Sequence, residues 1–164
     1  MAELTKIESK LGEVTGLAMA AKTATSRVTT LARKEHKELV PALERMHEEA
    51  AATEERCSEL AGSFEGKKTA ILEEARDTRD KAARMLEIYL DDDSEALDGF
   101  EFLTMAKAGE VGHWEVLKEM ADTAGDKQVI ELVGWALPIQ QGHLEGARKT
   151  AAQLAASESP HEKA

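Results

Sequence analysis

The stretch LTKIESKLGEVTGLAMAAKTATSRVTTLA, residues 4–32, decides the fold class of this chain. In it, apolar or small residues recur at steps of three and four: Leu4, Ile7, Leu11, Val14, Ala18, Ala21, Thr25, Val28 and Ala32. That spacing places them on one face of an α-helix, whereas a half-buried strand would need strict alternation. The stretch therefore predicts a long amphipathic helix that buries one face.

The same stripe resumes at Leu39 and continues to Leu60. The segment between the two stripes, residues 33–38, is charged and contains no glycine, and Pro41 is the only helix breaker nearby. Proline fits the first turn of a helix but kinks its interior. The sequence is thus compatible with two helices joined in the mid-thirties or with one long bent helix, and we favour two.

The remainder of the chain also has helical periodicity, interrupted by glycines and acidic turns. Sustained alternation of β-branched residues is absent, so we expect an all-α protein. The expected elements are a turn at 62–66, a third helix from about Lys67 to Leu90, a fourth from Glu95 to Thr123 capped by Ser94, and a fifth from about Lys127 to Ala155 kinked at Pro138.

Size and charge limit the classes of function open to the chain. At 164 residues it is long enough for one domain, which we expect to be a bundle over residues 1–155 followed by a frayed polar tail at 156–164. The net charge of −11 disfavours nucleic acid as a partner, because phosphate binding needs a basic stripe. The start is mixed in charge and no apolar run approaches a membrane span, so we expect a cytoplasmic protein without a membrane partner.

Cysteine usage and short motifs exclude several kinds of site. Cys57 is the only cysteine, so no internal disulfide can form, and its helical spacing with Thr53 and Leu60 predicts a small core residue. The sequence has no cysteine pair for a zinc ribbon, no glycine-rich phosphate loop and no Gly-x-Ser-x-Gly elbow.

Two pairs with the spacing Glu-x-x-His point to metal chemistry. Glu44 and His47 form the first pair, and Glu110 and His113 form the second. Carboxylate-bridged metal sites in four-helix bundles use this spacing because it puts both ligands on one face of a helix. Since glutamate is frequent here, about one such pair is expected by chance, and buried or surface histidines without a metal are the alternative interpretation.

The expected turn at Gly125 brings a third histidine to the same level. Residues equidistant from that turn should meet, so Glu110 should face Gln140, with His113 and His143 within a turn or two. Imidazole and carboxylate ligands suit iron, manganese or zinc better than calcium or magnesium. We therefore predict a metal site in the bundle core, formed by Glu44, His47, Glu110, His113 and His143.

At residues 98–117, DGFEFLTMAKAGEVGHWEVL, the chain resembles the bacterial ferritin-like stress-protein family of unknown function. In that family the third bundle helix carries a run ending in Glu-His-Tyr-Glu-Ile, and the match here is His113-Trp-Glu-Val. Residues 43–60, 66–93 and 121–154 resemble the second helix, the crossover segment and the last helix of the same family. The resemblance implies a ferritin-like antiparallel bundle of four to five long helices.

The chain departs from that family at positions where ligands are expected. Gly112 stands where the family has a glutamate directly before the histidine, Ala20-Ala21-Lys22 stands where the first helix would supply one, and Gln140-Gln141 replaces the usual carboxylates. Fewer carboxylates neutralise less of a buried dimetal charge, which counts against an oxidoreductase that activates oxygen or peroxide. A mononuclear or vestigial site is consistent with the residues that remain.

Two functions of different classes follow. The first, implied by the resemblance, is a ferritin-like protein that binds iron, manganese or zinc in its core and acts in bacterial stress or metal homeostasis. The second is a non-catalytic helical scaffold or dimerisation module with a vestigial, metal-free site. The near-heptad stripe over residues 4–32 suits burial against an identical chain, which predicts a homodimer.

Overall fold

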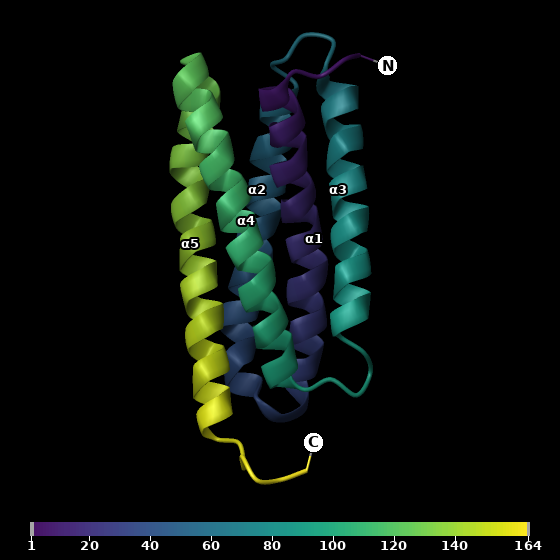
Figure 1. Cartoon of the computed structure of the whole chain (residues 1–164), viewed down its shortest axis with the longest axis vertical. Helices are drawn as coiled ribbons and strands as arrows, with labels where there is room; N and C mark the ends of the chain where they lie inside the picture. The colour runs from purple at the N-terminus through teal and green to yellow at the C-terminus, as the bar shows by residue number, and fades with distance from the viewer. Residues whose placement is uncertain (1, 164) are drawn as a thin grey trace.

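A computed structural model of the chain describes residues 2–163 and is all-helical, as predicted (Figure 1). No strand occurs within that range. The turn in the mid-thirties separates two helices, so the two-helix interpretation of residues 4–60 is confirmed. The elements are α1 (Lys6–Glu35), the short 3-10 turn η1 (Lys37–Leu39), α2 (Val40–Ala61), α3 (Lys68–Tyr89), α4 (Ala96–Ala124) and α5 (Lys127–Ala156).

Local signals explain where the helices begin and end. Pro41 lies in the first turn of α2, where its missing N–H is not needed. Glu95, and not the predicted Ser94, is the N-cap residue of α4, and its backbone N–H donates to Asp98 Oδ2 at 2.7 Å. Ser94 is unavailable because its hydroxyl hydrogen-bonds Asp91 in the preceding turn. Gly125 ends α4 in the left-handed region at φ 65°, which favours glycine.

The five helices run up and down along one common long axis (Figure 1). The central helix, α1, packs against α2, α3 and α4, while α4 and α5 form a second pair and α2 also touches α5. Because α3 returns along the whole length of the bundle, α2 and α4 run parallel to each other, whereas α1 and α2, like α4 and α5, are antiparallel (Figure 1). The architecture is thus four core helices with a helical crossover, α3, laid against α1.

Two glycines of α1 allow α3 to approach closely. A Cβ added at Gly12 would lie 2.8 Å from the carbonyl oxygen of Ile71, and one added at Gly16 would lie 2.2 Å from the carbonyl oxygen of Ala75. Side chains at these positions would therefore push the two helices apart. The spacing of four residues places both glycines on one face of α1, and α3 packs against that face.

The apolar core is divided into two clusters, one toward each end of the bundle. One cluster lies around Trp114 and the other around Phe100. The first consists of Leu11, Val14, Cys57, Ala61, Ile71, Trp114, Leu117, Ala121, Val129, Leu132, Val133 and Ala136; the second consists of Ala24, Val28, Ala32, Leu43, Met46, Leu90, Phe100, Phe102, Leu103 and Ala147. Between the two clusters, the middle of the bundle holds residues other than large apolar ones.

Much of the apolar stripe of α1 is buried inside the bundle. Leu11, Val14, Ala18, Val28 and Ala32 are all fully buried by the chain's own helices. This part of the stripe therefore packs within one chain, and the homodimer stays a prediction. Within residues 2–163, no helix combines the length and the apolar character that crossing a membrane requires.

Candidate functional site

Four polar side chains occupy the gap between the two apolar clusters. Lys107 and Glu110 of α4, with Gln140 and His143 of α5, are between 0% and 6% exposed. We call these four residues the polar layer. At the corresponding level α1 and α2 supply small residues, among them Ala18, Ala21, Ala50 and Thr53, which leave room for the longer side chains of α4 and α5.

Lys107 organises the polar layer. Its Nζ donates to Glu110 Oε2 at 2.7 Å and to Gln140 Oε1 at 3.1 Å. The Lys107–Glu110 pair follows the i,i+3 spacing of the helix, and Gln140 comes from α5 across the turn at Gly125. The expectation that Glu110 and Gln140 lie at one level is therefore met, with a lysine ammonium between them. Two opposite charges that are almost fully buried together make the layer electrically neutral at this point.

His143 lies at the α2 side of the layer and is held neutral. Burial lowers the pKa of its imidazole to about 4, the positive charge of Lys107 acts in the same direction, and Glu49 opposes both. The Nε2 atom of His143 lies 3.5 Å from Glu49 Oε2, which is too long for a strong hydrogen bond. At neutral pH the imidazole is therefore an uncharged buried group.

Several polar atoms of the layer have no hydrogen-bond partner. They include Glu110 Oε1, Gln140 Nε2 and both ring nitrogens of His143. Buried polar atoms in folded proteins are nearly always satisfied, so such a concentration in one place distinguishes the layer from ordinary core. Nearby, burial raises the pKa of the Cys57 thiol to about 12, which confirms the prediction of a small core residue and disfavours a thiolate ligand.

The first predicted ligand pair lies outside the bundle core. Glu44 is exposed and accepts a hydrogen bond from Arg33 at 3.3 Å, and His47 lines a shallow surface pocket between α1 and α2. The physical reason is helical rotation: Leu43 and Met46 face the core, so residues one position later point about 100° away from it. These two ligands do not join the others.

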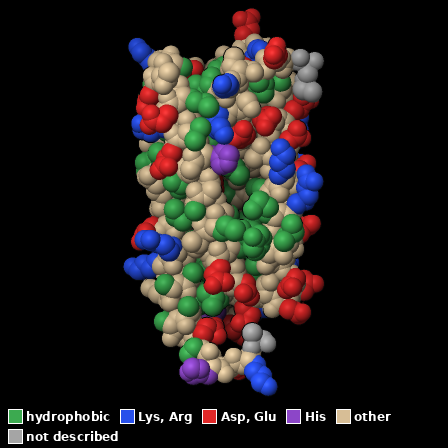
Figure 2. All heavy atoms as spheres, in the orientation of Figure 1, with side chains coloured by type: hydrophobic (Ala, Val, Ile, Leu, Met, Phe, Trp, Pro, Cys, Tyr) green, Lys and Arg blue, Asp and Glu red, His purple; other side chains and the backbone are tan. Residues whose placement is uncertain are grey.

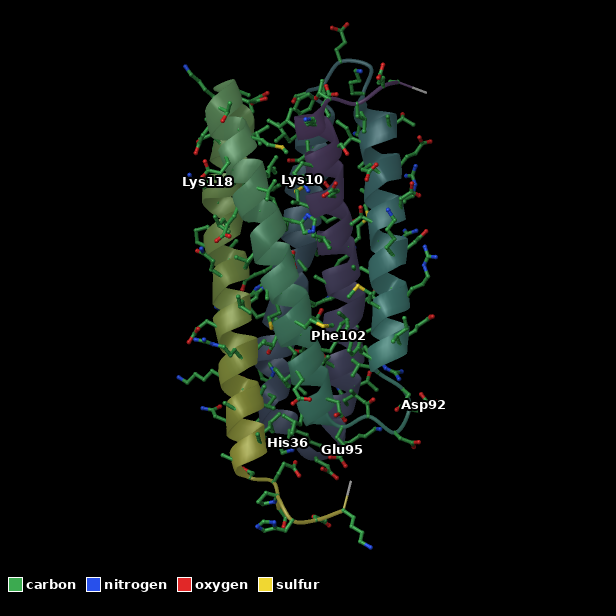
Figure 3. All side chains as sticks on the ribbon, viewed as in Figure 1. Lys10, His36, Asp92, Glu95, Phe102 and Lys118 are labelled. Atoms are coloured by element: carbon green, nitrogen blue, oxygen red, sulfur yellow. The ribbon has the colours of Figure 1, made fainter. Side chains whose placement is uncertain are left out.

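The second predicted pair is split between interior and surface. Glu110 is 4% exposed, but His113 is 42% exposed at the seam between α1 and α4. Its Nδ1 atom lies 3.1 Å from Glu13 Oε2 and 3.3 Å from Lys10 Nζ, and Lys10, labelled in Figure 3, also pairs with Glu13. Of the five predicted ligands, only Glu110 and His143 belong to the polar layer.

The residues of the layer do not fit the metal site that the ferritin-like resemblance implies. Within residues 2–163, no group of three or more His, Cys, Asp or Glu side chains is arranged to hold a metal ion. The buried donors come from α4 and α5 alone, whereas a carboxylate-bridged site draws ligands from four helices. The ammonium of Lys107 also neutralises Glu110 and would repel a cation placed beside it.

The residue that sequence reasoning missed is Lys107. A lysine surrounded by Ala106, Ala108 and Gly109 in an amphipathic helix is expected in solvent when its charge alone is considered. The available signal is its spacing: Lys107 lies three residues before Glu110 and four after the buried Leu103, on the core face of α4.

Two grooves border the layer on opposite sides of the bundle. The larger, of about 520 Å³, lies between α1, α3 and α4 and includes Lys107 and Glu110 in its lining. The second, of about 490 Å³, lies beside α2 and α5 and includes Glu49 and His143. Comparison with protein-family models, curated proteins and solved structures finds no match to this chain.

Proposed function

We propose that this chain is a ferritin-like bundle that acts as a metal-free binding scaffold. Ferritin-like bundles place one long crossover between two helical hairpins. The order of elements supports this assignment, since α1 and α2 pair, α4 and α5 pair, and α3 spans the length between them (Figure 1). The notion of a scaffold follows from the interior, where lysine and amide groups stand at the level of the predicted ligands.

The observation that carries the proposal is the buried Lys107–Glu110 pair. A carboxylate enclosed in a bundle core needs a cation beside it, because an unpaired buried charge is very costly. In a metal centre that cation is the metal ion, whereas here it is the Lys107 ammonium, 2.7 Å from Glu110 Oε2. Gln140, which is neutral, takes the place of a further carboxylate. No redox-active or Lewis-acidic group is then required for the interior to be electrically balanced.

Elemental analysis of the untagged protein tests the proposal. Cells are grown with ample iron, manganese and zinc, and metal per chain is measured for the parent, His143→Ala and His47→Ala. The two histidines are matched by chemistry and differ in location: His143 is buried in the core, and His47 lines the surface pocket between α1 and α2. We expect no stoichiometric metal in any of them. Stoichiometric metal that disappears in His143→Ala but persists in His47→Ala would mean a metal centre in the core.

A converse variant tests whether Lys107 stands at a metal position. Lys107→Glu combined with Gln140→Glu would give α4 and α5 three carboxylates beside His143, a donor set suited to iron, manganese or zinc. We expect the double variant to gain saturable binding of one of these ions in calorimetry, while Lys118→Glu, which changes an exposed lysine of the same helix, gains none. Equal behaviour of the two variants would argue against the assignment.

A further inference from the structure

The larger groove has the shape and lining of a small-molecule site. Its floor consists of the α1 alanines Ala20, Ala21 and Ala24, and its walls include Leu86 of α3 and Ala106 of α4. In Figure 2, which shows this face, hydrophobic side chains gather in the middle between acidic groups at both ends. A volume of about 520 Å³ lies within the range of pockets that enclose small organic molecules.

The packing of α3 creates this groove. Gly12 and Gly16 seat the first half of α3 directly on α1, and α3 makes no extensive contact with α4. Farther along, the two helices stand apart over the α1 alanines, and Met85 and Met105 at the rim are 46% and 38% exposed. Apolar side chains at the rim of an apolar floor favour an occupant that is itself apolar.

The charges around the groove are paired, which favours an uncharged occupant. At the inner wall Lys107 pairs with Glu110, and at the rim Arg79 pairs with Asp80 at 2.8 Å. His113, at one end, contacts Glu13 of α1. A charged head group inside the groove would lose water and meet no unpaired charge of opposite sign, because each cation of these two pairs already has its carboxylate.

One polar group of the lining still lacks a partner. Glu110 is more than nine-tenths buried, and its Oε1 atom accepts no hydrogen bond, whereas its Oε2 atom is taken by Lys107. Glu110 Oε1 can accept a hydrogen bond from a ligand, and the paired charges around the groove favour a donor that is itself uncharged. A hydroxyl group meets both requirements.

From these observations we infer that the groove between α1, α3 and α4 binds an uncharged aliphatic molecule that ends in a hydroxyl group. The aliphatic chain lies along the α1 alanines, and the hydroxyl donates to Glu110 Oε1. This inference rests on the proposed function, because a metal held by Glu110 would occupy the same carboxylate. It adds the class of ligand to the metal-free scaffold.

A series of straight-chain alcohols tests the inference on the full-length protein. Hexan-1-ol, octan-1-ol and decan-1-ol are titrated in turn while chemical-shift changes are followed by NMR. Each buried methylene should raise affinity about threefold to fourfold. Octanoate and octylammonium should bind roughly tenfold more weakly than octan-1-ol, because each brings an unpaired charge. Affinity that does not depend on chain length, or that is equal for the charged compounds, would overturn the inference.

Matched substitutions on α4 locate the binding. Ala106→Phe fills the groove, whereas Ala108→Phe places the same side chain at an exposed position two residues away. The first should abolish binding of octan-1-ol and the second should leave it unchanged, with helicity checked by circular dichroism. If Ala106→Phe does not fold, Ala20→Leu at the groove floor replaces it in the comparison. Equal loss in the groove-filling and exposed variants would refute the location.

Two further measurements distinguish a bound alcohol from a second copy of the chain and from a metal. Light scattering gives the oligomeric state: a parent dimer that Ala106→Phe converts to a monomer would mean that a second copy fills the groove, which overturns the inference. Metal analysis of the same preparation tests the proposed function independently. If the protein binds neither metal nor alcohol, only the inferred ligand class is refuted. If a metal is bound in the core, the proposed metal-free scaffold is refuted as well.

Discussion

Lys107→Met should destabilise the fold far more than the same change at an exposed lysine of the same helix. The variant removes the ammonium and keeps a flexible apolar side chain of similar length. It leaves the Glu110 carboxylate, 4% exposed, without the cation that lies 2.7 Å away in the parent. Gln140 loses its hydrogen-bond donor as well.

The magnitude follows from burial. Removing one partner of a buried ion pair costs about 3–5 kcal/mol, because the remaining charge is uncompensated. For a chain of this length that corresponds to a fall in Tm of roughly 10 °C. Replacing both partners removes the buried charge altogether, so Lys107→Met combined with Glu110→Met should lose less stability than either single variant. The strong coupling between the two positions is the signature of a buried pair.

Urea denaturation of four proteins, the parent, the two single variants and the double variant, measures this coupling at neutral pH. Lys118→Met is the matched control, since Lys118, labelled in Figure 3, also bonds an acidic residue of α4 at 2.8 Å but is 49% exposed. Its loss should be much smaller than that of Lys107→Met, because exposed ion pairs contribute little to stability. Additive losses at Lys107 and Glu110, or equal losses at Lys107 and Lys118, would refute the buried-pair reasoning.

Three further predictions concern pH, packing and thiol reactivity. The pKa of His143 is lowered from 6.5 to about 4, so the unfolded chain takes up a proton before the folded one as pH falls. Between those two pH values the free energy of unfolding of the parent should fall by about 3 kcal/mol more than that of His143→Gln. An equal pH dependence of the two proteins in urea denaturation would contradict this. Gly16→Ala should lower the free energy of unfolding by about 2 kcal/mol, because the added Cβ clashes with the Ala75 carbonyl. Gly112→Ala has open space around it and should raise the free energy of unfolding by about 0.5–1 kcal/mol. Thermal melts in which both variants shift Tm in the same direction would count against close α1–α3 packing. Cys57, buried and with a pKa of about 12, should react with a thiol reagent only as fast as the chain unfolds, and immediate labelling of the native protein would show that the cysteine is accessible.

The helices are predictable because their signals are local. Apolar spacing predicts α1, and Pro41 in a first turn marks the start of α2. The predicted cap of α4 is wrong by one residue: serine is the better N-cap by residue type, but the Ser94 hydroxyl bonds Asp91 in the preceding turn. The packing of α3 on α1 depends on contacts at Gly12 and Gly16 between helices far apart in sequence, which no local pattern encodes.

The interior site is predictable only in part, because its composition depends on helical rotation. A Glu-x-x-His pair looks the same in sequence whether it faces the core or the solvent. Glu44 and His47 follow the core positions Leu43 and Met46 by one residue, which turns them outward. On α4, Glu110 faces inward, and its buried neighbour is the preceding Lys107 rather than the following His113.

Stability and helix register explain little of the polar layer, which supports the proposed role in binding. A buried ion pair usually adds little stability compared with apolar residues of the same size. Polar core residues can fix the register of packed helices, but every member of this layer lies on α4 or α5, whose register is already set by the tight turn at Gly125 and the cap at Asp126. The hydrogen bonds of Lys107 stay within α4 and α5, and the contact of His143 with Glu49 of α2 is long, at 3.5 Å. Its placement between two grooves, with Glu110 at the wall of one and His143 at the wall of the other, fits the proposal that the groove beside Glu110 holds a ligand.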